Sequence, residues 1–239
     1  MNDETKAAPK RHVVRKVLFG IVLAFLVIEV IELPFPWTVA WLERNNPKMT
    51  AVMKERIRQA RAKDEPYKIR QTFVLLSRIS HVMVQSVIVG EDGTFYENHG
   101  VDWYEAQQSF EENWKEKKIV RGSSTITMQL AKNLWFSTSR DPLTKLNEII
   151  CAYMLDYFLT KNRVMELYLN YIEFGRGIFG VESASRTYFN EPASAITRSQ
   201  AAKLAAIIPS PLKHSPDSPS RFVAFRSNVI LARMDARGW

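Results

Sequence analysis

The sequence predicts a mainly α-helical fold, in which one lobed domain follows an amino-terminal transmembrane helix. Apolar side chains recur with helical spacing at Val164, Leu167, Tyr168 and Tyr171. Thr197 and Gln200 have the spacing of a capping box, and Pro209 ends the helical run that follows them. Strand patterns are weak, and residues 72–76 and 82–89 are the only candidates. These patterns indicate helices throughout the last two thirds of the chain.

The length and composition suit one catalytic domain with a membrane anchor. The chain has 239 residues, which is enough to bury one sizeable core. Its formal net charge of +8 is compatible with a nucleic acid, an anionic membrane surface or a phosphorylated ligand, and charge alone does not choose between them. The only cysteine, Cys151, excludes an internal disulfide.

The amino-terminal segment favours an uncleaved membrane anchor. Five cations precede an apolar run at 17–33: Lys6, Lys10, Arg11, Arg15 and Lys16. As a helix this run would span about 25 Å, slightly less than the membrane core, and Phe35, Trp37 and Trp41 could extend it as an aromatic belt. The basic flank predicts a cytoplasmic amino terminus, with the rest of the chain on the outer face.

Two other interpretations of this segment remain open. A cleaved signal peptide would need a small-residue cleavage site, and residues 35–42 offer none that is convincing. A buried soluble helix would not need five preceding cations. We therefore expect a basic tail and anchor at 1–36, a solvated helical connector at 37–71, and the catalytic domain at 72–239.

The segment at 91–102 carries the first candidate site residues. An apolar run ends at Gly90, and Glu91 follows at once, with Asp92 and Phe95 close behind. A carboxylate at the edge of a buried element can have a raised pKa and act as a general base or acid. The alternative is that Glu91 and Asp92 belong to a solvated turn.

A hydroxyl-rich block is the second candidate. Ser124 and Thr125 lie at a predicted helix start, where backbone amides suit a phosphate group. Lys132 follows on a similar helix face, and Arg140 comes after the helix. A capped amphipathic helix without a ligand would have the same pattern.

Two further polar positions lie on predicted helices. Lys145 and Glu148 are one turn apart at the start of a long helix, so that a surface ion pair would explain them. Asn170 is polar on an otherwise apolar helix, and most simply caps a buried one. Gly175, Gly177 and Gly180 follow, and their clustering predicts a loop with special backbone requirements.

Together, these blocks resemble the glycosyltransferase domain of class A penicillin-binding proteins and its monofunctional relatives. Residues 91–102 resemble that family's Glu-Asp-x-x-Phe-x-x-His-x-Gly motif, and residues 124–129 its Ser-Thr-Ile-Thr-x-Gln motif. Residues 145–148 are similar to Arg-Lys-x-x-Glu, and 166–175 to Glu-Leu-Tyr-Leu-Asn with a following Phe-Gly. Residues 200–211 are similar to its final Pro-Ser-Pro block. Because no transpeptidase signature follows, the resemblance is to the monofunctional type.

The resemblance implies a lysozyme-like bilobed domain that polymerises lipid II into peptidoglycan. The growing chain would pass, with inversion, from undecaprenyl pyrophosphate to the 4-hydroxyl of lipid II, forming β-1,4 linkages. Glu91 would be the base, while Glu148 would bind a divalent cation (Mg or Mn) or orient Lys145. The substrate-binding candidates are Asp92, Phe95, Ser124, Thr125, Gln129, Lys132, Arg140, Lys145 and Asn170.

The same resemblance sets the expected partners and location. The partners would be lipid II, the growing glycan, membrane lipid and other cell-wall synthesis proteins, with no nucleic acid. The enzyme would be a single-pass protein of the bacterial cytoplasmic membrane, with its active cleft close to the bilayer. Leu134, Trp135 and Phe136 are candidates for side chains that dip into the membrane, unless they pack into the core.

The sequence departs from the family pattern at several places, which include Ser123 and Met128, and other functions stay open. His99 and Gly100 are adjacent, whereas the family separates them, and Thr144 stands where arginine is usual. A glycan hydrolase of lysozyme type also uses two carboxylates in a helical domain. A non-enzymatic envelope scaffold could keep the motifs without turnover.

Overall fold

The computed structural model describes residues 33–116, 124–136, 138, 142–218 and 220–239, together with 15, 16, 19 and 20. It divides the chain into two compact units, Met1–Pro34 and Phe35–Trp239. The expected anchor at 1–36 falls almost entirely outside the described residues. Among the residues that are described, no helix is both long and apolar enough to cross a membrane.

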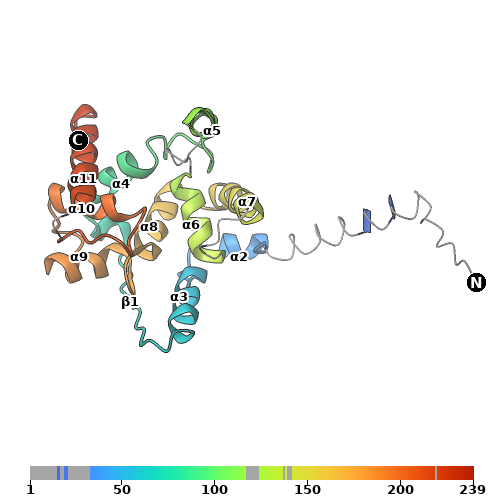
Figure 1. Cartoon of the computed structure of the whole chain (residues 1–239), viewed down its shortest axis with the longest axis horizontal. Helices are drawn as coiled ribbons and strands as arrows, with labels where there is room; N and C mark the ends of the chain where they lie inside the picture. The colour runs from blue at the N-terminus through green and yellow to red at the C-terminus, as the bar shows by residue number, and fades with distance from the viewer. Residues whose placement is uncertain are drawn as a thin grey trace, which may run out of the picture. The chain divides into compact units, whose positions relative to one another are not determined.

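The second unit is mainly helical, which confirms the predicted class (Figure 1). Its elements are α2 (Pro36–Trp41), α3 (Ala51–Arg61), β1 (Arg70–Gln71), η1 (Leu76–Arg78), α4 (His81–Glu91), α5 (Trp103–Glu116), α6 (Ile126–Trp135), α7 (Pro142–Phe158), α8 (Lys161–Tyr171), β2 (Glu173–Gly175), β3 (Ile178–Phe179), α9 (Val181–Phe189), α10 (Arg198–Ile207) and α11 (Arg221–Ala236). The expected capping box is present on α10, where Thr197 and Gln200 bond reciprocally.

Both strand predictions are wrong. Residues 82–89 form most of α4, and most of their side chains are buried around the whole helix. A helix buried on all sides has no polar stripe, so its sequence lacks the helical period that would distinguish it from a strand. Residues 72–76 form no strand, and the short β1 ends at Gln71, directly before them.

The helices form two groups that meet near the end of α4. In one group α4, α10 and α11 pack together, and in the other α6 packs on α7, α8 and α3 (Figure 1). Gly90 permits the closest part of the α4–α11 contact: a Cβ there would lie 3.2 Å from the Ile230 side chain. The last residues of α4 are therefore held directly against α11.

The glycine cluster has the special backbone requirements that the sequence predicts, but it belongs to a small sheet that the sequence does not predict. The strand order is β1-β3-β2, with β1 parallel and β2 antiparallel to β3. Gly177 and Gly180 have φ angles of 73° and 79°, which favour glycine. At Gly180 a Cβ would also lie only 2.5 Å from the Asn170 carbonyl oxygen. These two glycines let the hairpin close against the end of α8.

The segment expected to be a solvated connector is part of the folded unit. α3 buries Val52, Met53 and Ala60, and packs against α6. Arg56 on the same helix donates two hydrogen bonds through Nε and one through Nη2 to the carboxylate of Glu173. The many charged residues of this segment predict a solvated helix, but its few apolar side chains are enough to pack α3 against α6.

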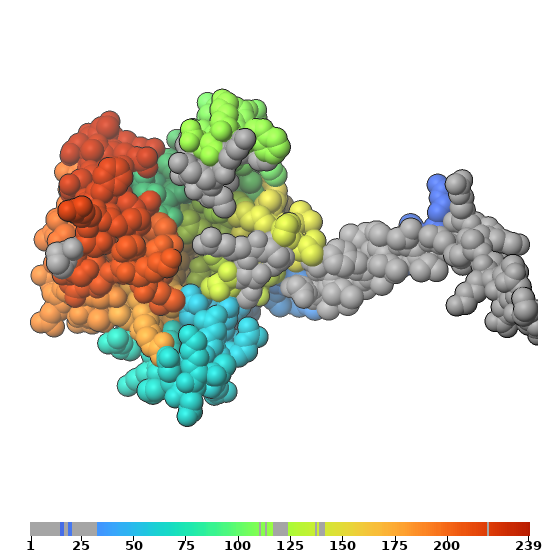
Figure 2. Space-filling view, viewed as in Figure 1, coloured from blue at the N-terminus to red at the C-terminus, as the bar shows by residue number. Residues whose placement is uncertain are grey.

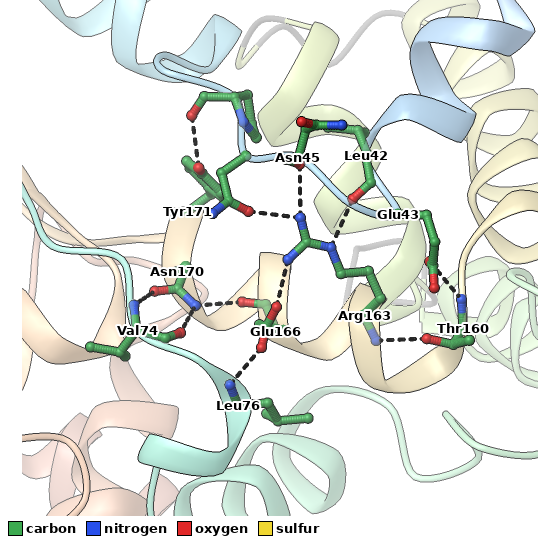
Figure 3. Close-up of polar contacts among 12 residues, drawn as sticks. Leu42, Glu43, Asn45, Val74, Leu76, Thr160, Arg163, Glu166, Asn170 and Tyr171 are labelled. Carbon is green, nitrogen blue, oxygen red and sulfur yellow. Dashed lines mark hydrogen bonds and ion pairs between the residues drawn. The ribbon is translucent and has the colours of Figure 1, made fainter.

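Arg163 on α8 ties residues 42–46 to this core (Figure 3). Its guanidinium donates to the carbonyl oxygens of Leu42 and Asn45, both at 2.7 Å, and forms an ion pair with Glu166. Glu166 in turn accepts from the backbone amide of Leu76 at 2.6 Å. One mostly buried arginine thus joins three chain segments that are distant in sequence.

Replacing Arg163 with Met should lower the free energy of unfolding by about 3 kcal/mol, because the buried Glu166 charge and two carbonyls lose their donor. Arg176→Met is the matched control. Its ion pair with Glu65 is about half exposed and should contribute well under about 1 kcal/mol. Thermal unfolding of both full-length variants in detergent measures the difference. Equal melting temperatures would show that Arg163 does not hold these segments.

Candidate active site

A polar cleft of about 670 Å³ lies where the two helix groups meet. Its floor is the end of α4 and the following loop, residues 89–94, and Ser124 and Thr125 form one wall. Three arginines also line it: Arg226 and Arg233 of α11, and Arg237 directly after that helix. On the face drawn in Figure 2 the surface is hollowed between α11 and α5. The cleft is wide enough for a large polar substrate.

Glu91 ends α4 at the floor of the cleft, with 9% of its side chain exposed. Its Oε2 accepts a hydrogen bond from Gln129 at 3.0 Å, and its Oε1 pairs with Arg226 at 3.2 Å. Burial raises the pKa of Glu91 to about 7, although the Gln129 bond and the Arg226 charge oppose the shift. A carboxyl group with this pKa can accept or release a proton at neutral pH.

Gln129 is held in one orientation by Tyr168. The Tyr168 hydroxyl donates to Gln129 Oε1 at 2.8 Å, so the amide nitrogen must face Glu91. Tyr168 itself is fully buried on α8, and burial raises its pKa well above the usual value. It therefore remains a hydroxyl donor. In the sequence Tyr168 is one residue of an apolar helix face, and its motif position is the one signal that indicates this role.

Asp92 faces away from its neighbour and joins the loop to α6. Its carboxylate accepts from the backbone amide of Ile126 at 3.0 Å and from the Asn98 side chain at 3.0 and 3.2 Å. Burial raises the pKa of Asp92, while the Ile126 and Asn98 bonds lower it. Asp92 borders the cleft, but its oxygens already have protein donors.

Ser124 and Thr125 stand at the start of α6, on the cleft wall. Thr125 is the N-cap: its hydroxyl accepts from the Met128 amide and donates to the Gly100 carbonyl at 2.6 Å. Ser124 instead accepts from Lys145 Nζ at 2.8 Å. Of the two hydroxyls, that of Ser124 is therefore the one linked to a charged side chain.

Lys145 and Glu148 form the ion pair that their spacing predicts, at 2.9 Å. Lys145 is about two-fifths exposed, whereas Glu148 is almost entirely buried. Among the described residues there is no group of three or more acidic, histidine or cysteine side chains that could hold a metal ion. The pair thus presents a lysine, oriented by a buried carboxylate, beside Ser124.

Lys132 and Arg140 are the other two candidate cations. Lys132 is half-buried on α6, and in the described part of the chain its ammonium group has neither a hydrogen bond nor an ion pair. It is available for an anionic ligand. Arg140 lies outside the described residues.

The structure places Phe95 and Asn170 inside the protein, away from the cleft. Phe95 is fully buried, with Tyr96 against its edge and the Lys161 ammonium 5.1 Å from its ring centroid. Asn170 is also fully buried, and its amide bonds the backbone of Val74 in both directions (Figure 3). Neither side chain has exposed surface for a substrate, so the expectation that they bind one finds no support here.

No sequence motif predicts a role for Arg226 and Arg233 of α11, or for Arg237 directly after that helix. Besides the Arg226 pair, Arg233 donates to the Val89 carbonyl and Arg237 to the Gly93 carbonyl, both at 3.0 Å. They lie beyond the last motif that the resemblance covers. Their spacing along one helix was the available signal, but a basic helix face is usually solvated.

The three residues expected to face the membrane, Leu134, Trp135 and Phe136, differ in exposure. Leu134 and Phe136 are buried, and only Trp135 is partly exposed, bordering a groove with Trp37 and Trp41 of α2. The end of α6 packs against α3, which covers the two side chains. That expectation is therefore wrong for Leu134 and Phe136, and the exposed aromatic residues lie elsewhere.

The fold and the cleft are those of a mainly helical protein with a nearly buried carboxylate beside a polar cleft. The chain belongs to the transglycosylase family, whose model matches residues 56–235. It is 37% identical to a biosynthetic peptidoglycan transglycosylase of Janthinobacterium sp. (strain Marseille), over 94% of this chain and 97% of the relative. Proteins of the same description from Methylobacillus flagellatus (37%, over 90% and 94%) and Chromobacterium violaceum (38%, over 92% and 95%) are similar.

This membership confirms the predicted class of enzyme. The protein is a glycosyltransferase of peptidoglycan synthesis that polymerises glycan chains. The family is defined by transfer, which favours polymerisation over the lysozyme-type hydrolase and the scaffold. The two glutamates and the lysines can now be assigned roles in that reaction.

Tyr168→Phe should lower the polymerisation rate by about tenfold, because the Gln129 amide loses the bond that aims it at Glu91. Tyr171→Phe is the matched control: its buried hydroxyl donates to the Pro47 carbonyl at 2.7 Å, away from the cleft. Each variant should lose about 1 kcal/mol of stability. Equal rates for the two variants would remove the role of Tyr168 in positioning Gln129.

Proposed function

We propose that the protein transfers a growing glycan from undecaprenyl pyrophosphate to the 4-hydroxyl of lipid II, with Glu91 as the general base. The observation that carries this assignment is the carboxylate of Glu91, nearly buried at the cleft floor with a pKa of about 7. An acceptor hydroxyl needs a base that is partly deprotonated at neutral pH. A well-placed base of this kind contributes about 10² to 10⁴ in rate.

In the proposed step, Glu91 removes the proton of the acceptor hydroxyl as its oxygen attacks the anomeric carbon of the donor. The bond from that carbon to the pyrophosphate breaks, and the pyrophosphate leaves with the bonding electrons. A single displacement inverts the α-linked donor to a β-1,4 product. No covalent glycosyl-enzyme is needed.

Lysines are proposed to stabilise the departing pyrophosphate. Lys132 has no partner among the described residues, and Lys145 stands beside Ser124 at the cleft wall. Preorganised charge of this kind is often the largest contribution to catalysis. Arg140 remains a sequence-based candidate for the same role.

Glu148 is assigned to orienting Lys145. Its mostly buried carboxylate pairs with the lysine, and no three-ligand group surrounds it among the described residues. Among the described residues this donor set fits an ammonium group and forms no dedicated divalent-cation site, and a divalent cation (Mg or Mn) at Glu148 stays a second proposal. The Lys145–Glu148 pair is electrically neutral. Glu148 is therefore proposed to hold the lysine in place and not to add positive charge to the site.

Glu91→Gln should abolish polymerisation of lipid II and leave the protein folded, because the amide keeps the shape but cannot take a proton. Glu97→Gln, an exposed carboxylate in the following loop, is the control and should be fully active. Chain growth is measured with purified lipid II, and folding by thermal unfolding. More than about a tenth of the wild-type rate would exclude Glu91 as the base, since that loss is only about 1.4 kcal/mol.

The proposal also includes attachment to the membrane that holds both lipid-linked substrates. Residues 1–36 would be the basic tail and single-pass anchor, followed by 37–71 and the glycosyltransferase domain at 72–239. The two helix groups would be the lobes of a lysozyme-like domain, on the outer face of the cytoplasmic membrane. Other cell-wall synthesis proteins remain predicted partners.

Exposed aromatic residues on three helices support a membrane-facing side. They are Phe35, Trp37 and Trp41 at α2, Trp103, Tyr104 and Trp114 on α5, and Tyr153 and Tyr157 on α7. α2 packs on α7, and Trp103 donates to the Tyr153 hydroxyl at 2.6 Å, so these helices adjoin. An exposed patch of this kind usually marks an interaction surface, and aromatic rings favour the bilayer interface.

Replacing Trp37 and Trp41 together with Ser should weaken binding of the compact unit 35–239 to phosphatidylglycerol-containing liposomes by at least about tenfold. The control replaces Leu212 and Phe225, which are similarly exposed but belong to the other helix group. Flotation measures binding, and thermal unfolding checks the fold. Equal binding of both double variants would place the membrane contact elsewhere.

A further inference from the structure

Arg226 is a cationic partner of Glu91 that comes from the far end of the chain. Its Nη2 lies 3.2 Å from Glu91 Oε1, across 135 positions of sequence. The opposite carboxylate oxygen accepts from Gln129. The carboxylate is therefore held between two donors, of which one is neutral and one is charged.

The packing of α11 on α4 fixes this approach. Gly90 leaves room for Ile230, which is one turn beyond Arg226 on α11. Arg233 and Arg237 donate to the carbonyls of Val89 and Gly93, on either side of Glu91. Three contacts along one helix thus keep Arg226 at a constant distance from the carboxylate.

The Arg226 contact is poorly built for stability alone. It is a single long bond, whereas a stabilising arginine–carboxylate pair is commonly bidentate. Its Nε is buried without a hydrogen-bond partner in the described structure. An unpaired buried donor is unfavourable for folding. The arrangement is easier to explain if Arg226 acts on the chemistry of Glu91.

We infer that Arg226 is a positioning residue for the transfer reaction, which holds the Glu91 carboxylate toward the cleft and favours its ionised form. The inference rests on the proposed role of Glu91 as the base. A base must be ionised before the acceptor hydroxyl can be activated. A fixed positive charge from α11 keeps a larger fraction of the enzyme in that state at neutral pH.

The other groups around Glu91 define what Arg226 must counteract. Burial is the largest influence and raises the pKa of Glu91, and the adjacent Asp92 raises it further. From α6, Gln129 lowers it through a hydrogen bond, and Tyr168 of α8 stays a neutral donor behind Gln129. Asp102 and Glu105 line the same cleft, and Arg233 and Arg237 already bond backbone carbonyls. Arg226 is therefore the cation that contacts the carboxylate directly.

The test is the pH profile of kcat/KM for lipid II polymerisation by the full chain, for wild type, Arg226→Lys and Arg226→Gln. The acidic limb reports the pKa of the base in the free enzyme. Loss of the charge should move this limb upward by about one unit, the low end for a carboxylate beside an arginine, since Arg226 is partly exposed. Arg226→Gln would then be about tenfold slower at pH 6 and within about twofold of wild type at pH 9.

Two comparisons separate this role from a structural one. Arg226→Lys keeps the charge and should leave the limb near its wild-type position. Arg198→Gln breaks an exposed ion pair between Arg198 of α10 and Asp235 of α11, and should change neither the rate nor the pH profile. A loss that is equal at every pH, an unmoved limb in Arg226→Gln, or the same shift in Arg226→Lys would overturn the inference.

The Glu91→Gln variant keeps failure of this inference distinct from failure of the proposed function. If Glu91→Gln is inactive at every pH but the Arg226→Gln limb does not move, Glu91 stands as the base and Arg226 has no part in its ionisation. If Glu91→Gln is active, the base itself is misassigned.

Discussion

The hydrogen bond between the Asp92 carboxylate and the Ile126 amide fixes the geometry on which the active cleft depends. It joins the end of α4 to the start of α6, two elements from different helix groups. Two other contacts at the site depend on this junction. Gln129 of α6 donates a hydrogen bond to Glu91. Ser124, which lies just before the first turn of α6, accepts one from Lys145. If the two helix ends separated, Glu91 would lose the Gln129 hydrogen bond and would move away from Ser124 and Lys145.

Two adjacent carboxylates therefore have opposite tasks because their surroundings differ. Asp92 accepts several protein donors and serves the structure. Glu91 has two donors, is nearly buried, and has a pKa of about 7, which suits proton transfer. Burial of α8 contributes to this difference, because Tyr168 can orient Gln129 only from inside the core. A buried residue, Tyr168, thus influences the hydrogen bonding of Glu91 through Gln129.

Local patterns predicted much of the fold and the centre of the site. The capping box of α10, the helical face of α8 and the pairing of Lys145 with Glu148 depend on residues within a few positions of one another. The failures arose where burial removed the pattern. α4 is apolar on all sides and reads as a strand. Phe95 and Asn170 are fully buried, and their roles in substrate binding stay predictions that rest on the motifs alone.

By itself, the sequence determined the helical class, the transglycosylase family, and the positions of the two glutamates and the candidate lysines. Those conclusions depend on residue types at short spacings, which a linear chain displays directly. Only the tertiary structure decided that α3 joins the folded unit, that Tyr168 aims Gln129, and that Arg226 faces Glu91. Such contacts join residues separated by tens to more than a hundred positions, and their direction is set by helix packing, which no local spacing encodes.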